Sequence, residues 1–162
     1  MSVEHPSAAL PDLPLIGAPL RVVGHVRCPL ADEDVGRARR HLVSTIEVLP
    51  ACAEALLGIE DYSQLFVLFW MDRAPPDPPL LTHPRGDRSL PAAGVFANRG
   101  RARPNPIGLA VVDLLERRGA VLTVRRLDAW DGTPVIDLKP YDHYDVHPDP
   151  RVPAWFRQRL AP

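Results

Sequence analysis

The residues best suited to chemistry lie between Gly94 and Leu109, in the sequence GVFANRGRARPNPIGL. Arg99, Arg101 and Arg103 are spaced two apart within it, and no acidic residue interrupts them. In an extended chain such side chains point the same way, so the spacing predicts one ridge of three guanidinium groups. The prolines that follow restrict the backbone and stiffen the loop. A rigid cationic loop suits a phosphate, carboxylate or nucleotide, although a solvated basic hairpin tip fits the same residue types.

A second group of candidate ligand residues surrounds the turn from Asp131 to Pro134, which reads DGTP. Asp-Gly is a common tight-turn pair, so structure alone can explain it. The functional alternative uses the neighbouring Asp128 and Trp130 as well. Carboxylates can hold ribose hydroxyls or an ammonium group, and an indole can cover an adenine ring or a sulfonium.

Several other chemistries lack their sequence signals. The glycines have neither the spacing nor the following helix of a nucleotide-binding loop, and no G-x-S-x-G nucleophile motif is present. His143 and His147 have a spacing that joins two metal ligands only on a helix, and prolines bracket their segment. Cys28 and Cys52 are too few for a disulfide framework. We therefore expect no metal site and two ordinary thiols.

Composition favours one domain with a localised anionic partner. The chain has 162 residues and a formal net charge of −1. Residues 85–126, however, carry nine arginines against three acidic residues, a net charge of +6. No apolar run approaches the length of about 18 residues that spans a membrane. The first residues also lack the pattern of a signal peptide, so we expect a cytoplasmic protein without a membrane segment.

The apolar pattern predicts mainly β-structure. Candidate strands cover residues 20–27, 41–49, 64–71, 107–115, 120–127 and 135–138. The run at 64–71 has no polar face, so we expect a strand that is buried on both sides. Strands of this number in one domain favour a closed or nearly closed β-barrel of about six to seven strands, since closure removes sheet edges.

Helices are expected to be few and short. Pro50 opens an alanine-rich segment that Gly58 can end, and residues 152–160 have an amphipathic pattern. Residues 72–91 contain six prolines, so no regular element is expected there. The predicted organisation is a flexible proline-rich leader at 1–19, the barrel domain at 20–144 and a tail at 145–162.

Two long blocks resemble a known family. GVFANRGRARPNPIGLAVVDLL (Gly94 to Leu115) and LDAWDGTPVIDLKPY (Leu127 to Tyr141) resemble the TrmO family, also called YaeB-like or TsaA-like. Its members are S-adenosylmethionine-dependent tRNA N6-threonylcarbamoyladenosine methyltransferases. The resemblance covers Leu20 to Asp142 and implies a homodimeric β-barrel. It also implies methyl transfer to N6 of a threonylcarbamoyl-adenosine beside the tRNA anticodon.

The resemblance implies roles for individual residues as well. The cofactor-pocket positions are Met71, Asp72, Arg73, Arg99, Leu109, Asp128, Ala129, Trp130, Asp131, Gly132 and Thr133. The positions expected to meet the tRNA backbone are Arg101, Arg103 and Lys139. The sequence identifies no catalytic base.

Two segments depart from the family pattern. Residues 31–41 read ADEDVGRARRH where the family carries a Pro-Arg-Gln-type motif. The arginine-rich loop, Asn98 to Pro106, also differs from the family pattern. Both segments are expected to meet the substrate. Two alternatives to a tRNA methyltransferase therefore stay open: a methyltransferase of the same barrel that acts on a small molecule, and a non-catalytic module that binds S-adenosylmethionine or RNA.

Overall fold

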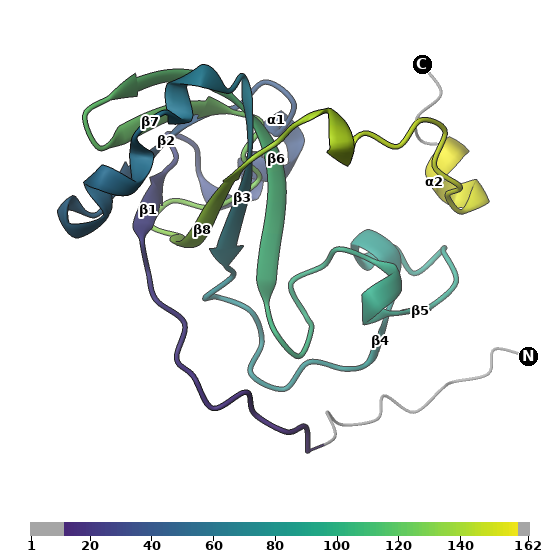
Figure 1. The fold of residues 1–162 in the computed structure, drawn as a ribbon. Helices are drawn as coiled ribbons and strands as arrows, with labels where there is room; N and C mark the ends of the chain where they lie inside the picture. Colours follow the sequence, from purple (N-terminus) through teal and green to yellow (C-terminus); the bar gives the residue numbers. More distant parts are fainter. Residues whose placement is uncertain (1–11, 159–162) are drawn as a thin grey trace, which may run out of the picture.

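The computed structural model describes residues 12–158 and contains a closed antiparallel β-barrel (Figure 1). Its strands follow one another around the barrel in the order β1-β2-β7-β6-β3-β8. The strands are β1 (Gly24–Arg27), β2 (Val43–Val48), β3 (Gln64–Trp70), β6 (Ile107–Arg118), β7 (Val121–Arg125) and β8 (Pro134–Pro140). The predicted barrel is thus confirmed.

The strand β3 lies between β6 and β8 and supplies much of the core. Leu65, Val67 and Phe69 point inward and are buried, because side chains of a strand alternate between its two faces. The residues between them, on the outer face, are only half-buried. The expectation that this strand is buried on both sides was therefore wrong: the wall of a single barrel covers one face only.

The long strand β6 pairs with two neighbouring strands, β3 and β7. Its first half pairs with β3, and from Asp113 onward it pairs with β7. The Asp113 carboxylate accepts hydrogen bonds from Gln64 on β3 (3.2 Å) and Arg125 on β7 (2.9 Å), which lower the pKa of this carboxyl group. Gly119 forms the turn to β7 with a φ of 61°, as the sequence predicted.

The helices are short, and one of them was not expected. The helix α1 (Asp32–Ala38) lies between β1 and β2, where the sequence indicated only a connector, and it buries Val35 against the core. The helix expected from Pro50 is present as a 3-10 helix, η1 (Pro50–Leu56). A further 3-10 turn, η2 (Ile59–Asp61), follows Gly58, which has a φ of 82°.

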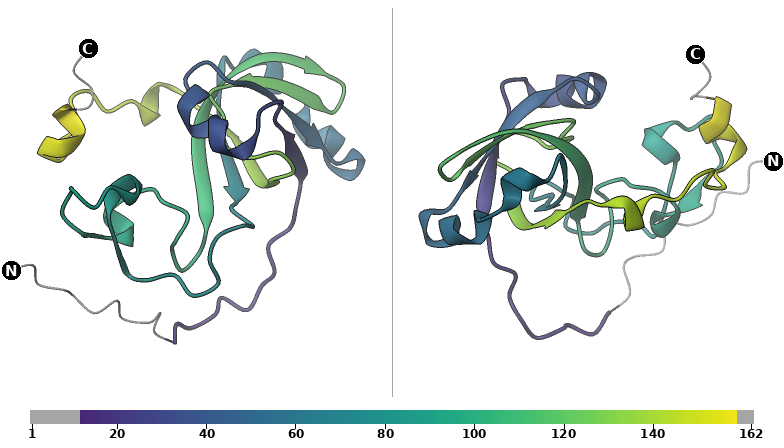
Figure 2. Two further views of the ribbon diagram at one scale, coloured as in Figure 1. Left: turned by 180° about the vertical axis from the view of Figure 1, so that it is seen from behind. Right: turned by 45° about the horizontal axis from the view of Figure 1, so that its top comes forward.

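A long segment between β3 and β6 stands beside the barrel (Figures 1 and 2). It contains a small sheet of β4 (Leu81–Thr82) and β5 (Ala93–Gly94), with the 3-10 turns η3 (Pro84–Gly86) and η4 (Val95–Ala97). The expectation of no regular element at 72–91 was therefore wrong. The short elements avoid the dense prolines at 75–79, because proline lacks the N–H that a helix or sheet needs.

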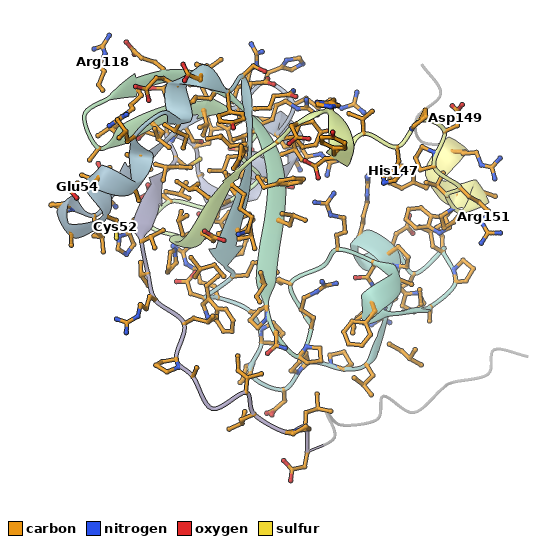
Figure 3. The ribbon with its side chains drawn as sticks, viewed as in Figure 1. Cys52, Glu54, Arg118, His147, Asp149 and Arg151 are labelled. Carbon is orange, nitrogen blue, oxygen red and sulfur yellow. The ribbon has the colours of Figure 1, made fainter. Side chains whose placement is uncertain are left out.

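The described segments before β1 and after β8 lie outside the barrel (Figure 1). Residues 12–23 have no regular element, and the part of the predicted leader at 1–11 lies outside the described residues. Beyond β8, the 3-10 turn η5 (His143–Asp145) and the helix α2 (Ala154–Gln158) follow, and the last residues of the predicted 152–160 helix are also outside the described part. Figure 3 shows His147, Asp149 and Arg151 on this tail. No helix within residues 12–158 has the length and apolar character to cross a membrane.

Gly108 offers a test of how the barrel wall is packed. A Cβ atom at this position would lie 2.1 Å from the ring of Phe69, which is buried in the core. Gly108→Ala should lower the free energy of unfolding by about 1–3 kcal/mol, because Phe69 must leave its rotamer. Urea denaturation measures this change. Gly36→Ala, in α1 with no atom within 4 Å of the added Cβ, is the matched control and should be neutral or stabilising. Equal stabilities of the two variants would contradict this packing.

Candidate functional site

The loop between β7 and β8 closes one end of the barrel. This end, called the loop end below, is where β1 and β3 finish and where β6 and β8 begin. Leu127, Ala129 and Thr133 turn inward and are buried, whereas Asp128 and Asp131 are exposed. The buried side chains fix the loop to the core. Ala129 and Thr133 can therefore meet a ligand only through their backbone.

Hydrogen bonds to the end of β1 hold the same loop. The Asp131 carboxylate accepts from the backbone N–H of Cys28 at 2.9 Å. The N–H of Gly132 donates to the carbonyl of Val26 at 2.9 Å, and the N–H of Val26 donates to the carbonyl of Thr133 at 2.9 Å. Gly132 has a φ of 78°, which glycine adopts without strain, so the Asp-Gly turn predicted from the sequence is confirmed.

Arg73, three residues after the end of β3, connects this loop to α1. Its guanidinium donates to the carboxylate of Asp32 at the start of α1 and to the carbonyl of Asp131 at 3.0 Å. The guanidinium carbon of Arg73 also lies 5.4 Å from the centre of the Trp130 ring. Arg39, just after α1, pairs at 3.8 Å with Asp128. Sequence reasoning missed both α1 contacts, although the acidic-then-basic order of residues 32–40 was a signal for them.

The arginine-rich loop does not form one ridge. The guanidinium of Arg103 donates to the carbonyls of Val95, Asn98 and Gly100, and that of Arg99 donates to the carbonyl of Leu109. Arg101 instead lies with its guanidinium carbon 4.7 Å from the centre of the Trp130 ring. The predicted ridge is therefore wrong, because residues 95–106 form a 3-10 turn followed by bends and irregular backbone, not an extended strand.

Three chain segments thus meet at the loop end. Arg73 joins the segment after β3 to residues 128–133, and Arg101 joins the arginine-rich loop to Trp130. The N–H of Met71 donates to the carbonyl of Pro106 at 2.7 Å, which joins the segment after β3 to the arginine-rich loop. Beside these contacts lies a cavity of ≈ 260 Å³ that is lined by Met71, Asp72, Arg103 and several prolines. Ten of the eleven positions implied as cofactor contacts belong to these segments, and the eleventh, Leu109, lies near the start of β6, where its carbonyl accepts from Arg99.

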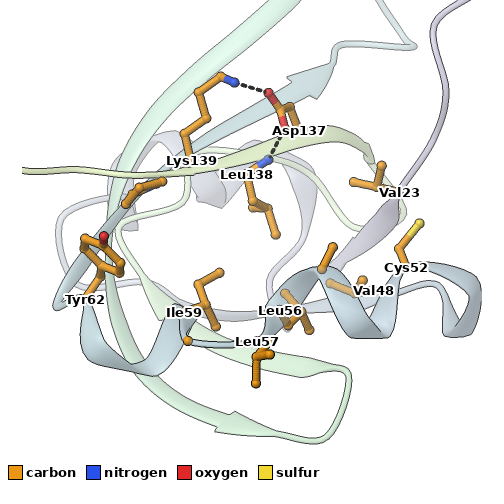
Figure 4. A pocket seen from close by; sticks show the side chains of 13 residues that line it. Val23, Val48, Cys52, Leu56, Leu57, Ile59, Tyr62, Asp137, Leu138 and Lys139 are labelled. Carbon is orange, nitrogen blue, oxygen red and sulfur yellow. Dashed lines mark hydrogen bonds and ion pairs between the residues drawn. The ribbon is translucent and has the colours of Figure 1, made fainter.

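Lys139 is the exception among the implied ligand residues. It lies near the far end of β8, five residues or roughly 17 Å along the strand from Pro134. Its ammonium group pairs with Asp137 at 2.8 Å. Figure 4 shows these two residues above a second cavity of ≈ 270 Å³, whose wall is mostly apolar and includes Leu56 and Ile59. The structure therefore does not bring Lys139 together with the other site residues.

The described residues contain no group of side chains suited to a metal centre. Between residues 12 and 158, no three His, Cys, Asp or Glu side chains are grouped so that they could hold a metal ion. The chemistry that the site offers is recognition by arginine, carboxylate and indole groups around an ordered backbone turn.

The fold and the site together define a small β-barrel domain whose candidate ligand-binding groups lie mainly on loops at one end. The sequence model of the tRNA-methyltransferase O N-terminal domain matches residues 34–145. The chain belongs to this family, which confirms the resemblance seen in the sequence.

Individual relatives agree with this assignment. A probable S-adenosyl-L-methionine-binding protein of Archaeoglobus fulgidus is 48% identical over 126 residues, which are 75% of this chain and 33% of the relative. The tRNA (adenine(37)-N6)-methyltransferase of Escherichia coli is 39% identical over 97 residues, covering 55% of this chain and 40% of the relative. The crystal structure of TrmO from Pseudomonas aeruginosa matches with a TM-score of 0.66 and 32% identity, over 84% of this chain and 62% of that chain. This chain thus spans a third to two thirds of these proteins.

The bond between Asp131 and Cys28 gives a prediction about the loop. Asp131→Ala leaves the half-buried Cys28 N–H without its acceptor, so the free energy of unfolding should fall by about 1–3 kcal/mol. Asp131→Asn retains an oxygen in that place and should keep most of the stability. Urea denaturation of the two variants measures the difference. If Asp131→Ala were as stable as the unaltered protein, this hydrogen bond would not be an anchor of the loop.

Proposed function

We propose that this chain transfers the methyl group of S-adenosylmethionine to N6 of threonylcarbamoyl-adenosine beside the anticodon of tRNA. The observation that carries this proposal is the ordered loop 128–133, in which the Trp130 ring lies against Arg73 and Arg101 and the Asp128 carboxylate pairs with Arg39. The names of the relatives support the same cofactor and the same kind of acceptor.

The residues of the loop end fit such a cofactor by their chemistry. Asp128 and the second oxygen of Asp131 suit ribose hydroxyls or the ammonium group of an amino acid. Trp130 offers a ring for an adenine or a sulfonium. Arg99 fixes the carbonyl of Leu109, whose side chain is 48% exposed on β6. These groups would bind the cofactor, with Ala129 and Thr133 contributing backbone only.

The protein's part in the reaction is mainly alignment. S-adenosylmethionine supplies an electrophilic methyl carbon when it is bound. The anchored loop orients the donor, and the arginine-rich loop orients the acceptor in line with it. The N6–H of threonylcarbamoyl-adenosine lies between a carbonyl and a purine ring and is more acidic than that of a plain amine. We therefore assign no side chain as a general base.

The anionic acceptor agrees with the charge of the site region. Residues 85–126 carry a net charge of +6, which suits the limited footprint of an anticodon loop. Arg101 is the arginine best placed for direct contact, since Arg103 is committed to loop carbonyls. A contact of Lys139 with tRNA stays a prediction that needs an acceptor long enough to reach the other end of the barrel. Because the proposed acceptor is tRNA, we propose that the protein acts in the cytoplasm.

We also propose that the chain acts as a homodimer, as its family resemblance implies. The outer face of β3 and β6 supports this. It carries half-buried Phe66, Leu68 and Trp70 beside Leu109, which is 48% exposed. Neighbouring apolar side chains on one face are suited to an interface with a second copy.

A small-molecule acceptor is the second candidate. The cavity of ≈ 260 Å³ beside Met71 and Asp72 favours it, because the proline-rich segment 74–78 forms one wall of a space of small-ligand size. The third possibility, a binding module without catalysis, predicts cofactor binding but no turnover on tRNA.

Nucleoside analysis of the host's tRNA separates these possibilities. The gene is deleted in a host that has no second copy, and total tRNA is digested and analysed by mass spectrometry. The methylated threonylcarbamoyl-adenosine should disappear and return with the unaltered gene. Arg99→Ala should restore about a tenth of it or less, because the Leu109 carbonyl loses its charged donor.

The matched control is Arg118→Ala, which should restore the nucleoside fully. Figure 3 shows Arg118 at the tip of the β6–β7 hairpin, where it pairs with Glu116. An unchanged nucleoside profile after deletion would contradict the tRNA proposal and favour one of the other two candidates.

A further inference from the structure

The guanidinium cation of Arg101 lies over Trp130, in the candidate cofactor loop 128–133. Its guanidinium carbon is 4.7 Å from the centre of the Trp130 ring, and the side chain is exposed. Within residues 12–158 its guanidinium makes no hydrogen bond and no ion pair. All five of its N–H donors are therefore available to a ligand.

The neighbouring arginines differ from it in this respect. Arg73 shares the Trp130 ring but donates to Asp32 and to the Asp131 carbonyl. Arg99 donates to the carbonyl of Leu109, and Arg103 donates to three loop carbonyls. These three arginines use their guanidinium groups to connect parts of the site, whereas Arg101 contacts the site through the Trp130 ring.

Contact with an indole ring prepares a guanidinium for one kind of ligand. It restricts the motion of the group and lowers the rotamer entropy that binding would otherwise cost, while the N–H donors stay open. Such an edge matches the two oxygens of a carboxylate with two parallel hydrogen bonds. A phosphate offers oxygens too, but the backbone phosphates of an anticodon loop do not have to approach the cofactor loop, whereas the substituent on N6 does.

On the basis of the proposed methyl transfer, we infer that Arg101 binds the carboxylate of the threonylcarbamoyl group and thereby selects the acceptor. The threonine part of this group carries a free carboxylate a few bonds from N6. An arginine beside the donor's loop can therefore bind the substituent while N6 faces the methyl group. This role replaces the backbone contact that the sequence indicated for Arg101. It also gives the enzyme a way to reject unmodified adenosine, which has no such anion.

The test compares two acceptors and three proteins. The acceptors are anticodon stem-loop RNAs that carry either threonylcarbamoyl-adenosine or its carboxamide, in which the carboxylate is a neutral amide. The proteins are the unaltered chain, Arg101→Gln and the control Arg118→Gln. The measured quantities are kcat/KM for each RNA and the Kd of S-adenosylhomocysteine.

The unaltered protein and Arg118→Gln should prefer the carboxylate RNA over the carboxamide by about 10- to 100-fold. Arg101→Gln should lose this preference, with kcat/KM falling on the carboxylate RNA and nearly unchanged on the carboxamide. Its Kd for S-adenosylhomocysteine should stay within about twofold of that of the unaltered protein. Arg101→Lys should recover only part of the preference, because an ammonium group cannot form two parallel hydrogen bonds.

Three results would overturn this role, each in a distinguishable way. A matching loss of S-adenosylhomocysteine affinity would assign Arg101 to the carboxylate of the cofactor. An equal loss on both RNAs, with a salt slope reduced by about one unit, would assign it to a backbone phosphate. No turnover of either RNA by the unaltered protein would contradict the proposed function itself, and the role of Arg101 with it.

Discussion

The structure depends on the junction between the end of β1 and the loop that precedes β8. Three hydrogen bonds join Val26 and Cys28 to residues 131–133, and Leu127 and Ala129 bury their side chains in the core beside them. The same contacts hold β1 to the loop before β8 and fix the backbone that carries Trp130, Asp128 and Asp131. Stability and site geometry are therefore properties of one set of interactions, and a residue such as Asp131 serves both.

The remaining site residues are positioned by the strands that end or begin beside this junction. Met71 and Arg73 follow the end of β3, and β6 begins at Ile107, directly after the arginine-rich loop. Close packing of Phe69 over Gly108 lets these two strands approach each other, and the N–H of Met71 then reaches the Pro106 carbonyl. Arg73 and Arg101 approach the Trp130 ring from these two segments, so cation–π contacts connect parts that are distant in sequence.

Much of this could be predicted from the sequence, for identifiable reasons. The strands are rich in β-branched and aromatic residues, and the turns at Gly119 and Gly132 need a positive φ that glycine provides. The helix α1 could not be predicted, because Val35 is its only buried residue and one apolar side chain gives no helical period. The partners of the arginines could not be predicted either. Arg73 and Asp32 are 41 residues apart, and only the closed barrel brings them together. Lys139 follows the candidate cofactor loop 128–133 closely in sequence, yet the direction of β8 places it at the opposite end of the barrel.

Amide NMR during a titration with S-adenosylhomocysteine tests the central claim most directly, since the claim is that the loop end of the barrel is the cofactor site. The chain of 17.9 kDa is small enough for residue-specific assignment. Shifts should concentrate at the Trp130 indole N–H, at the amides of residues 128–133 and at Met71 to Arg73, with Leu109 included. Residues around the apolar cavity at the other end, such as Leu56 and Ile59, should not move. Shifts confined to that opposite cavity, or none at saturating ligand, would contradict the account.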